Sequence, residues 1–295
     1  MTFDLGSTMK VLRPYPNVLA FYDGRIPGVR AHSPEPNWLD DGAFTLGTAS
    51  YAIVEGEDAL VYDTHMSLTH ARTIRKTLTD MGVTRMRVVQ SHWHTDHVAG
   101  NEAFADCEII GNALTVAALG ANREWLETND PPIKPIVPPN RVFENQMRLK
   151  VGSTVVELRQ LDIHSYDETV MLLPAQGLFF AGDTLEDTCT YVTEPERLAY
   201  HLADLERLST WKFDKILPNH GSLERIAAGG YPREFIEATR LYVEKLQRLP
   251  DEPGLGQQDL QMFAREALAT GAIDYYPAYE PVHRHNVAQM LELEG

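Results

Sequence analysis

The stretch Ser91-His-Trp-His-Thr-Asp-His97 gathers three imidazoles and one carboxylate. His92 and His94 are two residues apart, so both side chains can point the same way beyond the end of a strand. Asp96 and His97 follow at once and can face a neighbouring position. Imidazole and carboxylate are the ligands that zinc prefers when no thiolate is offered. The stretch could therefore supply a pair of ligands to each of two metal ions.

The residues before this motif predict a unit of strand, helix and strand. Ser50 to Val54 and Leu60 to Tyr62 are short β-rich runs on either side of Glu-Gly-Glu-Asp, which predicts a hairpin. Apolar residues then recur at helical spacing before Gly82, and Met86 to Gln90 predicts another strand. The strands that flank the helix should be parallel, with a right-handed crossover. Sites in such sheets form at the carboxyl ends of the strands, where the histidine motif begins.

Three more candidate ligands each follow an apolar run that predicts a strand. His164 ends the run from Val156 to Ile163. Asp183 stands in Gly-Asp-Thr after Leu-Phe-Phe-Ala, and His220 stands in Asn-His-Gly after Ile-Leu-Pro. Ser, Asn or Gly would be more usual after a strand, so we expect these three side chains to meet the histidine motif.

The rest of the chain predicts one α/β domain followed by helices. Residues 1–41 predict irregular structure with short strands, and the Pro-rich stretch Asn129 to Pro139 predicts a loop. Thr193-Glu-Pro-Glu196 matches a capping box that would open a helix. We expect a catalytic domain over residues 1–230 and a helical extension packed on it over residues 231–295. Further strands are predicted at residues 155–161, 169–173, 177–180 and 215–217, and further helices at 235–249, 259–270 and 281–294.

Composition excludes several classes of protein but does not indicate which reaction the protein catalyses. The 295 residues are enough to bury a sizeable core, and 26 Lys and Arg against 42 Asp and Glu give a net charge of −16. Such a surface repels phosphate backbones, so we expect no nucleic-acid partner. No apolar run approaches a membrane span, the first ten residues lack the apolar part of a secretory signal, and Cys107 and Cys189 are too far apart for a disulfide framework. We expect a cytoplasmic protein that acts on a small molecule and could form a homo-oligomer.

Taken in order, the His-Trp-His-Thr-Asp-His motif, the lone His164, Gly-Asp-Thr and Asn-His-Gly resemble the metallo-β-lactamase superfamily over about residues 50–221. The resemblance implies a four-layer αβ/βα sandwich, with two sheets back to back, helices outside, and metals at one edge of the sheets. Asp63, in Val-Tyr-Asp-Thr, matches a family Asp that supports the ligand loop. The implied ligands are His92, His94 and His164 for the first metal, Asp96, His97 and His220 for the second, and Asp183 as the bridge.

This resemblance implies a binuclear-zinc hydrolase with two Zn²⁺ per chain, iron or manganese being other possible metals. The metals would hold a hydroxide as the nucleophile and polarise the substrate carbonyl. Asp96 would orient the hydroxide and could carry its proton to the leaving group. We expect hydrolysis of a small ester, lactone, thioester or amide.

Departures from known branches of the family bear on the substrate. Zinc β-lactamases usually carry Cys or a non-bridging residue where Asp183 stands, which speaks against a dedicated lactamase but leaves β-lactam hydrolysis as an alternative. The stretch around His220 lacks the basic and Tyr residues with which glyoxalase II binds glutathione. Acyl-homoserine lactonases commonly carry a Tyr shortly after the bridging Asp, whereas the third residue after Asp183 here is Glu186 and the nearest tyrosine is Tyr191. Candidates for binding the substrate are Trp93, Tyr166 and Tyr191, and further pocket candidates are Trp38, Arg123 and Trp125.

Other classes share the implied fold. Persulfide dioxygenases hold a single iron and have no need of Asp96, His97 and His220 as a second site, so a mononuclear-iron oxidoreductase is the main alternative. Flavodiiron relatives have Glu where this chain has His94. Nucleases need a positive surface, which the net charge of −16 does not provide, and non-catalytic scaffolds usually lose ligands, none of which is missing here.

The remaining histidines are expected outside the site. His65 and His70 are predicted on the surface of the first helix. His283 and His285 are predicted in a solvated or interface role.

Overall fold

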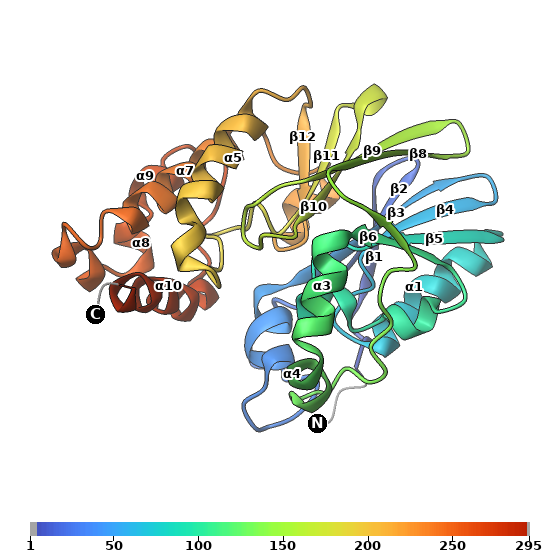
Figure 1. Cartoon of the computed structure of the whole chain (residues 1–295), viewed down its shortest axis with the longest axis horizontal. Coiled ribbons are helices and arrows are strands. Elements are labelled where there is room, and N and C mark those ends of the chain that lie inside the picture. Colours follow the sequence, from blue (N-terminus) through green and yellow to red (C-terminus); the bar gives the residue numbers. More distant parts are fainter. Residues whose placement is uncertain (1–4, 294–295) are drawn as a thin grey trace.

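The computed structural model describes residues 5–293, which form two β-sheets lying face to face (Figure 1). The first sheet has seven strands in sequential order: β1 Lys10–Tyr15, β2 Val18–Asp23, β3 Thr48–Glu55, β4 Asp58–Tyr62, β5 Arg85–Val89, β6 Glu108–Asn112 and β7 Arg141–Phe143. The second sheet has the order β12-β11-β10-β9-β8, with β8 Gln146–Val151, β9 Thr154–Gln160, β10 Thr169–Leu173, β11 Leu178–Gly182 and β12 Lys215–Pro218.

Helices cover the outer faces of both sheets (Figure 1). They are α1 Leu68–Asp80, α2 Thr95–Val98, α3 Ala113–Ala121, α4 Arg123–Thr128, α5 Leu198–Ser209, α6 Leu223–Ala227, α7 Glu234–Gln247, α8 Leu260–Phe263, α9 Arg265–Leu268 and α10 Glu280–Glu292. Within residues 5–293, no helix has the length and apolar character needed to cross a membrane.

The alternation of side chains along β11 shows how the layers are joined. Phe180 points inward and meets the ring of Tyr51 at 5.3 Å, whereas its neighbour Phe179 points outward and stacks on Phe213 at 4.7 Å. Since successive residues of a strand face opposite sides, one apolar run fills two interfaces. On the far side, Ile74 of α1 packs against the outer face of the first sheet. The predicted four-layer αβ/βα sandwich is confirmed.

The predicted strand–helix–strand unit is also confirmed. β3 and β4 form an antiparallel hairpin, and β4 pairs in parallel with β5 after the crossover through α1. Ser67 caps α1, its hydroxyl accepting a hydrogen bond from the backbone N–H of His70. Gly82 follows the helix with φ of +89°, a conformation that glycine adopts without strain.

The capping box predicted at Thr193 to Glu196 does not form. Helix α5 begins at Leu198, and its N-cap residue Arg197 makes no side-chain cap hydrogen bond. The carboxylate of Glu194 instead accepts a hydrogen bond from the backbone N–H of Tyr166, so the segment is held against the loop that carries His164. Pro195 opens a separate 3₁₀ turn before the helix.

The C-terminal helices pack in the same hydrophobic core as the second sheet. Buried residues of α7 and α10, among them Tyr242 and Met290, belong to one cluster with Val170 of β10. The stretch predicted as one helix at 259–270 is divided at Ala264 into α8 and α9, and the predicted helix 281–294 corresponds to α10, with residue 294 outside the described residues. The domain boundary at residue 230 stays a prediction.

Candidate metal centre

All the predicted ligands lie at one edge of the two sheets, because they follow the carboxyl ends of strands that run the same way. The histidine motif follows β5 and leads into α2. His164 lies in the loop after β9, Asp183 comes directly after β11, and His220 lies just beyond β12. Strands β9, β11 and β12 share one direction in the second sheet, so their ends meet at the same edge.

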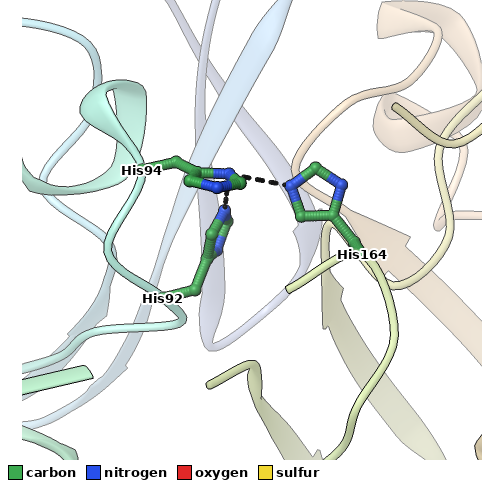
Figure 2. A group of neighbouring side chains, drawn as sticks. All are labelled: His92, His94 and His164. Carbon is green, nitrogen blue, oxygen red and sulfur yellow. Dashed lines mark hydrogen bonds between the residues drawn. The ribbon is translucent and has the colours of Figure 1, made fainter. Parts of the chain in front are cut away.

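Three imidazoles from two loops converge on one point (Figure 2). His94 Nδ1 lies 2.9 Å from His92 Nε2 and 2.9 Å from His164 Nε2. A neutral imidazole carries one N–H, so His94 can donate to one of these nitrogens at most. A cation bound between the three nitrogens would satisfy all of them, which is the arrangement of a three-histidine metal site. His164 has φ of +68°, an uncommon value for a residue with a side chain.

A second group lies beside the first and shares Asp183 with it. Asp96 lies 3.5 Å from His97 Nε2 through Oδ1 and 3.1 Å from His220 Nε2 through Oδ2. Asp183 Oδ2 lies 3.1 Å from His97 Nε2 and 3.3 Å from His220 Nε2. The same oxygen is 3.8 Å and 3.6 Å from the facing nitrogens of the first group. Asp183 is thus placed where a carboxylate could bridge two metals.

The fold fixes which nitrogen the second group offers. His97 Nδ1 lies 2.9 Å from Asp63 Oδ2, and His220 Nδ1 lies 2.8 Å from the carbonyl oxygen of Gly47. Because both partners accept hydrogen bonds, each ring carries a proton on Nδ1, and in its neutral form it has the Nε2 lone pair facing the centre. Asp63 also accepts a hydrogen bond from the backbone N–H of Ser91 at 2.7 Å. The structure therefore places Asp63 behind the ligand loop, and its support of a metal ligand stays a prediction.

Two carboxylates that the sequence did not single out as site residues support the first group. Glu168 Oε2 lies 3.1 Å from His92 Nδ1, and Glu186 Oε1 lies 3.2 Å from His164 Nδ1. Both carboxylates are buried. Glu186 stands three residues after the predicted ligand Asp183, and this closeness in sequence could have pointed to it. Glu168 directly precedes β10 and belongs to no motif.

The pKa values of His92 and His94 in the first group are lowered, whereas those of both histidines in the second group are raised. Burial lowers the pKa of His94 to about 3, and burial together with neighbouring imidazoles lowers the pKa of His92, so both rings are neutral near pH 7. Burial also opposes charge on His97 and His220, yet the carboxylates, chiefly Asp183, outweigh it and raise the pKa of both. The second group therefore favours a positive charge at its centre.

The donor set fits divalent metal. Asp183 Oδ1 is buried and accepts no hydrogen bond within the described part of the chain. There, the ion-pair partners of Asp96 and Asp183 are all histidines, and none is Lys or Arg. Buried carboxylates are normally paired or bound to metal. Neutral imidazoles and carboxylates at this spacing suit zinc and related divalent ions.

A cavity of about 530 Å³ opens in front of the centre. It is lined by the predicted candidates Trp93 and Tyr191, and also by Trp38 and Trp125. Tyr166 and Arg123 are not among its lining residues. The ring of Tyr166 lies instead under the guanidinium of Arg197, 5.8 Å away.

Three of the four histidines considered outside the predicted ligand set are buried. His65 and His70 are fully buried and stack at 4.4 Å, because the start of α1 is covered by β2, whose Asp23 lies 2.9 Å from His70 Nε2. His283 is also buried, and its Nδ1 lies 3.0 Å from the hydroxyl of Tyr242. His285 lines the cavity and stacks on Tyr191 at 4.8 Å. The predicted surface positions of His65 and His70 were wrong, as was a solvated role for His283, whereas an interface role for His283 and His285 stays a prediction.

Comparison with known families agrees with this geometry. Residues 44–254 match the model of the metallo-β-lactamase superfamily. Since the match covers more than half of the chain, the chain belongs to the metallo-β-lactamase superfamily. This membership agrees with the predicted class, a metal-dependent hydrolase.

Relatives are similar over part of the sequence. A hydroxyacylglutathione hydrolase of Rhodobacter capsulatus is 31% identical over 115 residues, which are 39% of this chain and 40% of that protein. An atrochrysone carboxyl ACP thioesterase of Aspergillus terreus is 25% identical over 184 residues, which are 62% of this chain and 52% of that protein. The chain thus spans about half or less of the length of these relatives.

Solved structures share the fold at low identity. A metallo-β-lactamase from Pontibacter korlensis aligns with a TM-score of 0.62 and 16% identity over 80% of this chain and 99% of that chain. A metallo-β-lactamase from Hirschia baltica aligns with a TM-score of 0.58 and 16% identity, again over 80% of this chain and 98% of that chain.

Proposed function

We propose that the protein is a binuclear-zinc hydrolase that cleaves a small ester, lactone, thioester or amide. The observation that carries the proposal is the position of Asp183 Oδ2, within 3.1 to 3.8 Å of imidazole nitrogens from both groups. A carboxylate in that position suits two metals that act together. One relative is named a thioesterase, which supports an acyl substrate.

Zinc bound by the two groups would supply a Lewis acid and a water of lowered pKa. The residues of the chain would bind and orient the reactants. Asp96 is positioned to accept and release a proton, since its carboxylate borders the cavity. The imidazole of His97 holds that carboxylate ionised, and with the hydrogen bond from His220 it outweighs the effect of burial and lowers the pKa of Asp96. The ring of Trp93, which meets His94 at 4.8 Å, forms a wall that limits water on one side.

Chelation tests the proposal. The zinc-loaded protein should hydrolyse 4-nitrophenyl acetate, lose the activity on treatment with dipicolinate, and regain it when zinc is added back. His94→Ala should abolish the metal-dependent rate. The control is His32→Ala, because His32 pairs with Asp130 and neither residue lines the cavity. Turnover that survives complete metal removal would contradict the proposal.

The mononuclear-iron oxidoreductase stays the alternative. It leaves the second group without a role, although the ligand atoms of Asp96, His97 and His220 converge closely enough to hold a metal ion, as those of the first group do. Oxygen uptake with a persulfide substrate would favour that alternative. A small-molecule substrate, the absence of nucleic-acid and membrane partners, homo-oligomer formation and a cytoplasmic location also stay predictions.

A further inference from the structure

The cavity in front of the metal centre is walled by aromatic side chains. Three of the four tryptophans of the chain, Trp38, Trp93 and Trp125, line it. The rings of Trp93 and Trp125 meet edge to face at 5.9 Å, and the indole N–H of Trp38 is fixed by a hydrogen bond of 2.8 Å to the carbonyl of Pro131. Trp93 and Trp125 thus form an aromatic pair at one side of the cavity, and Trp38 adds a third indole to the lining.

The opposite wall comes from the C-terminal part of the chain. Helix α10 contributes Pro281, Val282 and His285, and the ring of His285 stacks on Tyr191 at 4.8 Å with an interplanar angle of 16°. His285 Nε2 lies 3.2 Å from the carbonyl oxygen of Val192, which fixes the orientation of the imidazole. The C-terminal helix therefore shapes the space that an acyl group would enter.

The charges around the cavity are one-sided. Among the described residues that line it there is no Lys or Arg, while Asp41, Asp96, Asp183 and Glu186 are present. The carboxylate of Asp41, one of the lining residues, accepts hydrogen bonds from two nitrogens of the Arg30 guanidinium, which does not itself line the cavity. The carboxylates that face the centre would offset much of the charge of bound metal. A carboxylate on the substrate, away from the bond that is cleaved, would thus find no cation in the walls.

We infer that the site selects uncharged substrates with an aromatic or bulky apolar acyl group and discriminates against anionic ones. The inference rests on the proposed hydrolase function and narrows its substrate class. Apolar walls with a few convergent polar groups are typical of pockets that bury most of a small ligand. An anionic acyl chain would lose hydration there without gaining a partner, whereas a phenyl group would replace water against three indoles. Glutathione conjugates, which carry carboxylates, are accordingly poor substrates for this chain.

A matched pair of esters tests the charge preference. Methyl 4-nitrophenyl glutarate and 4-nitrophenyl hydrogen glutarate share the leaving group and chain length, and the second is anionic near pH 7. The zinc-loaded full chain should prefer the neutral ester in kcat/KM by about tenfold or more, as expected when a charged group is left unpaired in an apolar pocket. Trp125→Arg should raise kcat/KM for the anionic ester and narrow that gap. Trp125 suits such a change because half of its surface is exposed.

A second pair of esters tests the preference for an aromatic acyl group. The ratio of kcat/KM for 4-nitrophenyl 3-phenylpropanoate to that for 4-nitrophenyl acetate should exceed about 10, and Trp125→Ala should lower it several-fold. The control is Trp211→Ala, because Trp211 lies under Arg159, away from the cavity. That variant should keep the ratio of the wild-type protein.

The outcomes separate the two proposals. Metal-dependent turnover with equal or higher kcat/KM for the anionic ester would overturn the substrate class and leave the hydrolase intact. An aromatic ratio that falls equally in Trp125→Ala and Trp211→Ala would overturn the role of the wall. No metal-dependent turnover of any of the four esters would defeat the proposed function, and the substrate inference with it.

Discussion

Asp63 joins the second group of ligands to the rest of the fold. It has φ of +63°, a conformation that Asp and Asn tolerate better than most residues, so Asp63→Asn should keep the backbone. The variant would lose one of the two acceptors that now contact Ser91 N–H and His97 Nδ1. We expect zinc affinity to fall about 10- to 100-fold, measured by competition with a chromogenic chelator.

The control for this variant is Asp80→Asn at the exposed end of α1, where the carboxylate pairs with Lys76. Its zinc affinity should equal that of the wild-type protein. Unchanged affinity in Asp63→Asn would show that the His97 tautomer is fixed by other contacts.

Glu194, which is not a predicted ligand but lies beside the loop of His164, gives the fold a pH dependence. Burial raises the pKa of Glu194 from 4.5 to about 7. A carboxyl group whose pKa is higher in the folded than in the unfolded state destabilises the fold as it ionises, so this contribution to the free energy of unfolding falls from pH 4.5 to 7. Relative to the wild-type protein, Glu194→Gln should become more stable on going from pH 5 to pH 7.5, by on the order of 2 kcal/mol.

Urea denaturation of both proteins at the two pH values measures this difference. Glu196→Gln, at an exposed position two residues away, should show no change relative to wild type. A difference between Glu194→Gln and wild type that is the same at both pH values would contradict the assignment.

Among the helices, α10 is joined to the segment around Tyr191 by the hydrogen bonds of one side-chain amide, that of Asn286. Asn286 Oδ1 accepts a hydrogen bond from the backbone N–H of Val192, and Nδ2 donates to the carbonyl of Thr190 and the hydroxyl of Tyr242. All four residues are buried. Asn286→Ala would leave these groups unpaired, so we expect a loss of about 2–4 kcal/mol in the free energy of unfolding.

Urea denaturation also checks this prediction. The matched control on the same helix is Arg284→Ala, whose side chain is 68% exposed and should contribute little. Equal stability of Asn286→Ala and wild type would mean that water replaces the lost amide.

Elements with strong local patterns were predictable from the sequence. The hairpin of β3 and β4, helix α1 and the parallel strand β5 follow from alternation, helical spacing and a terminal glycine. Strand β7 was not predicted, because its three residues carry too short a pattern. The capping box did not form because the hydroxyl of Thr193, its expected N-cap residue, donates to the carbonyl oxygen of His164, which is distant in sequence.

Site residues were likewise predictable where a local motif marks them, and not where their role depends on contacts distant in sequence. The seven predicted ligands are brought together because each follows a strand end, which the order of motifs along the chain reveals. Glu168, behind His92, could not be predicted, since its role depends on a neighbour distant in sequence. His65 and His70 were placed on the surface because nothing local shows that β2 covers the start of α1. Ligation by the seven residues stays a prediction.

For the whole molecule, the two sheets and the site depend on each other. Tyr62 of the first sheet donates to the carbonyl of Thr169 at 2.5 Å, and Tyr22 donates to that of Gly221 at 3.0 Å. Both hydrogen bonds cross between the sheets, and Gly221 adjoins His220. The helices of the C-terminal part complete the cavity from the other side. The sandwich therefore holds in register two ligand groups that neither sheet could assemble alone.

The most direct test of the central claim is metal stoichiometry by elemental analysis of protein purified without added metal. The wild-type chain should contain about two zinc ions, and His94→Ala and Asp183→Ala should each contain fewer. About one iron per chain would contradict the binuclear-zinc site and favour the oxidoreductase. Wild-type protein that holds no metal and takes none up would contradict the metal centre altogether.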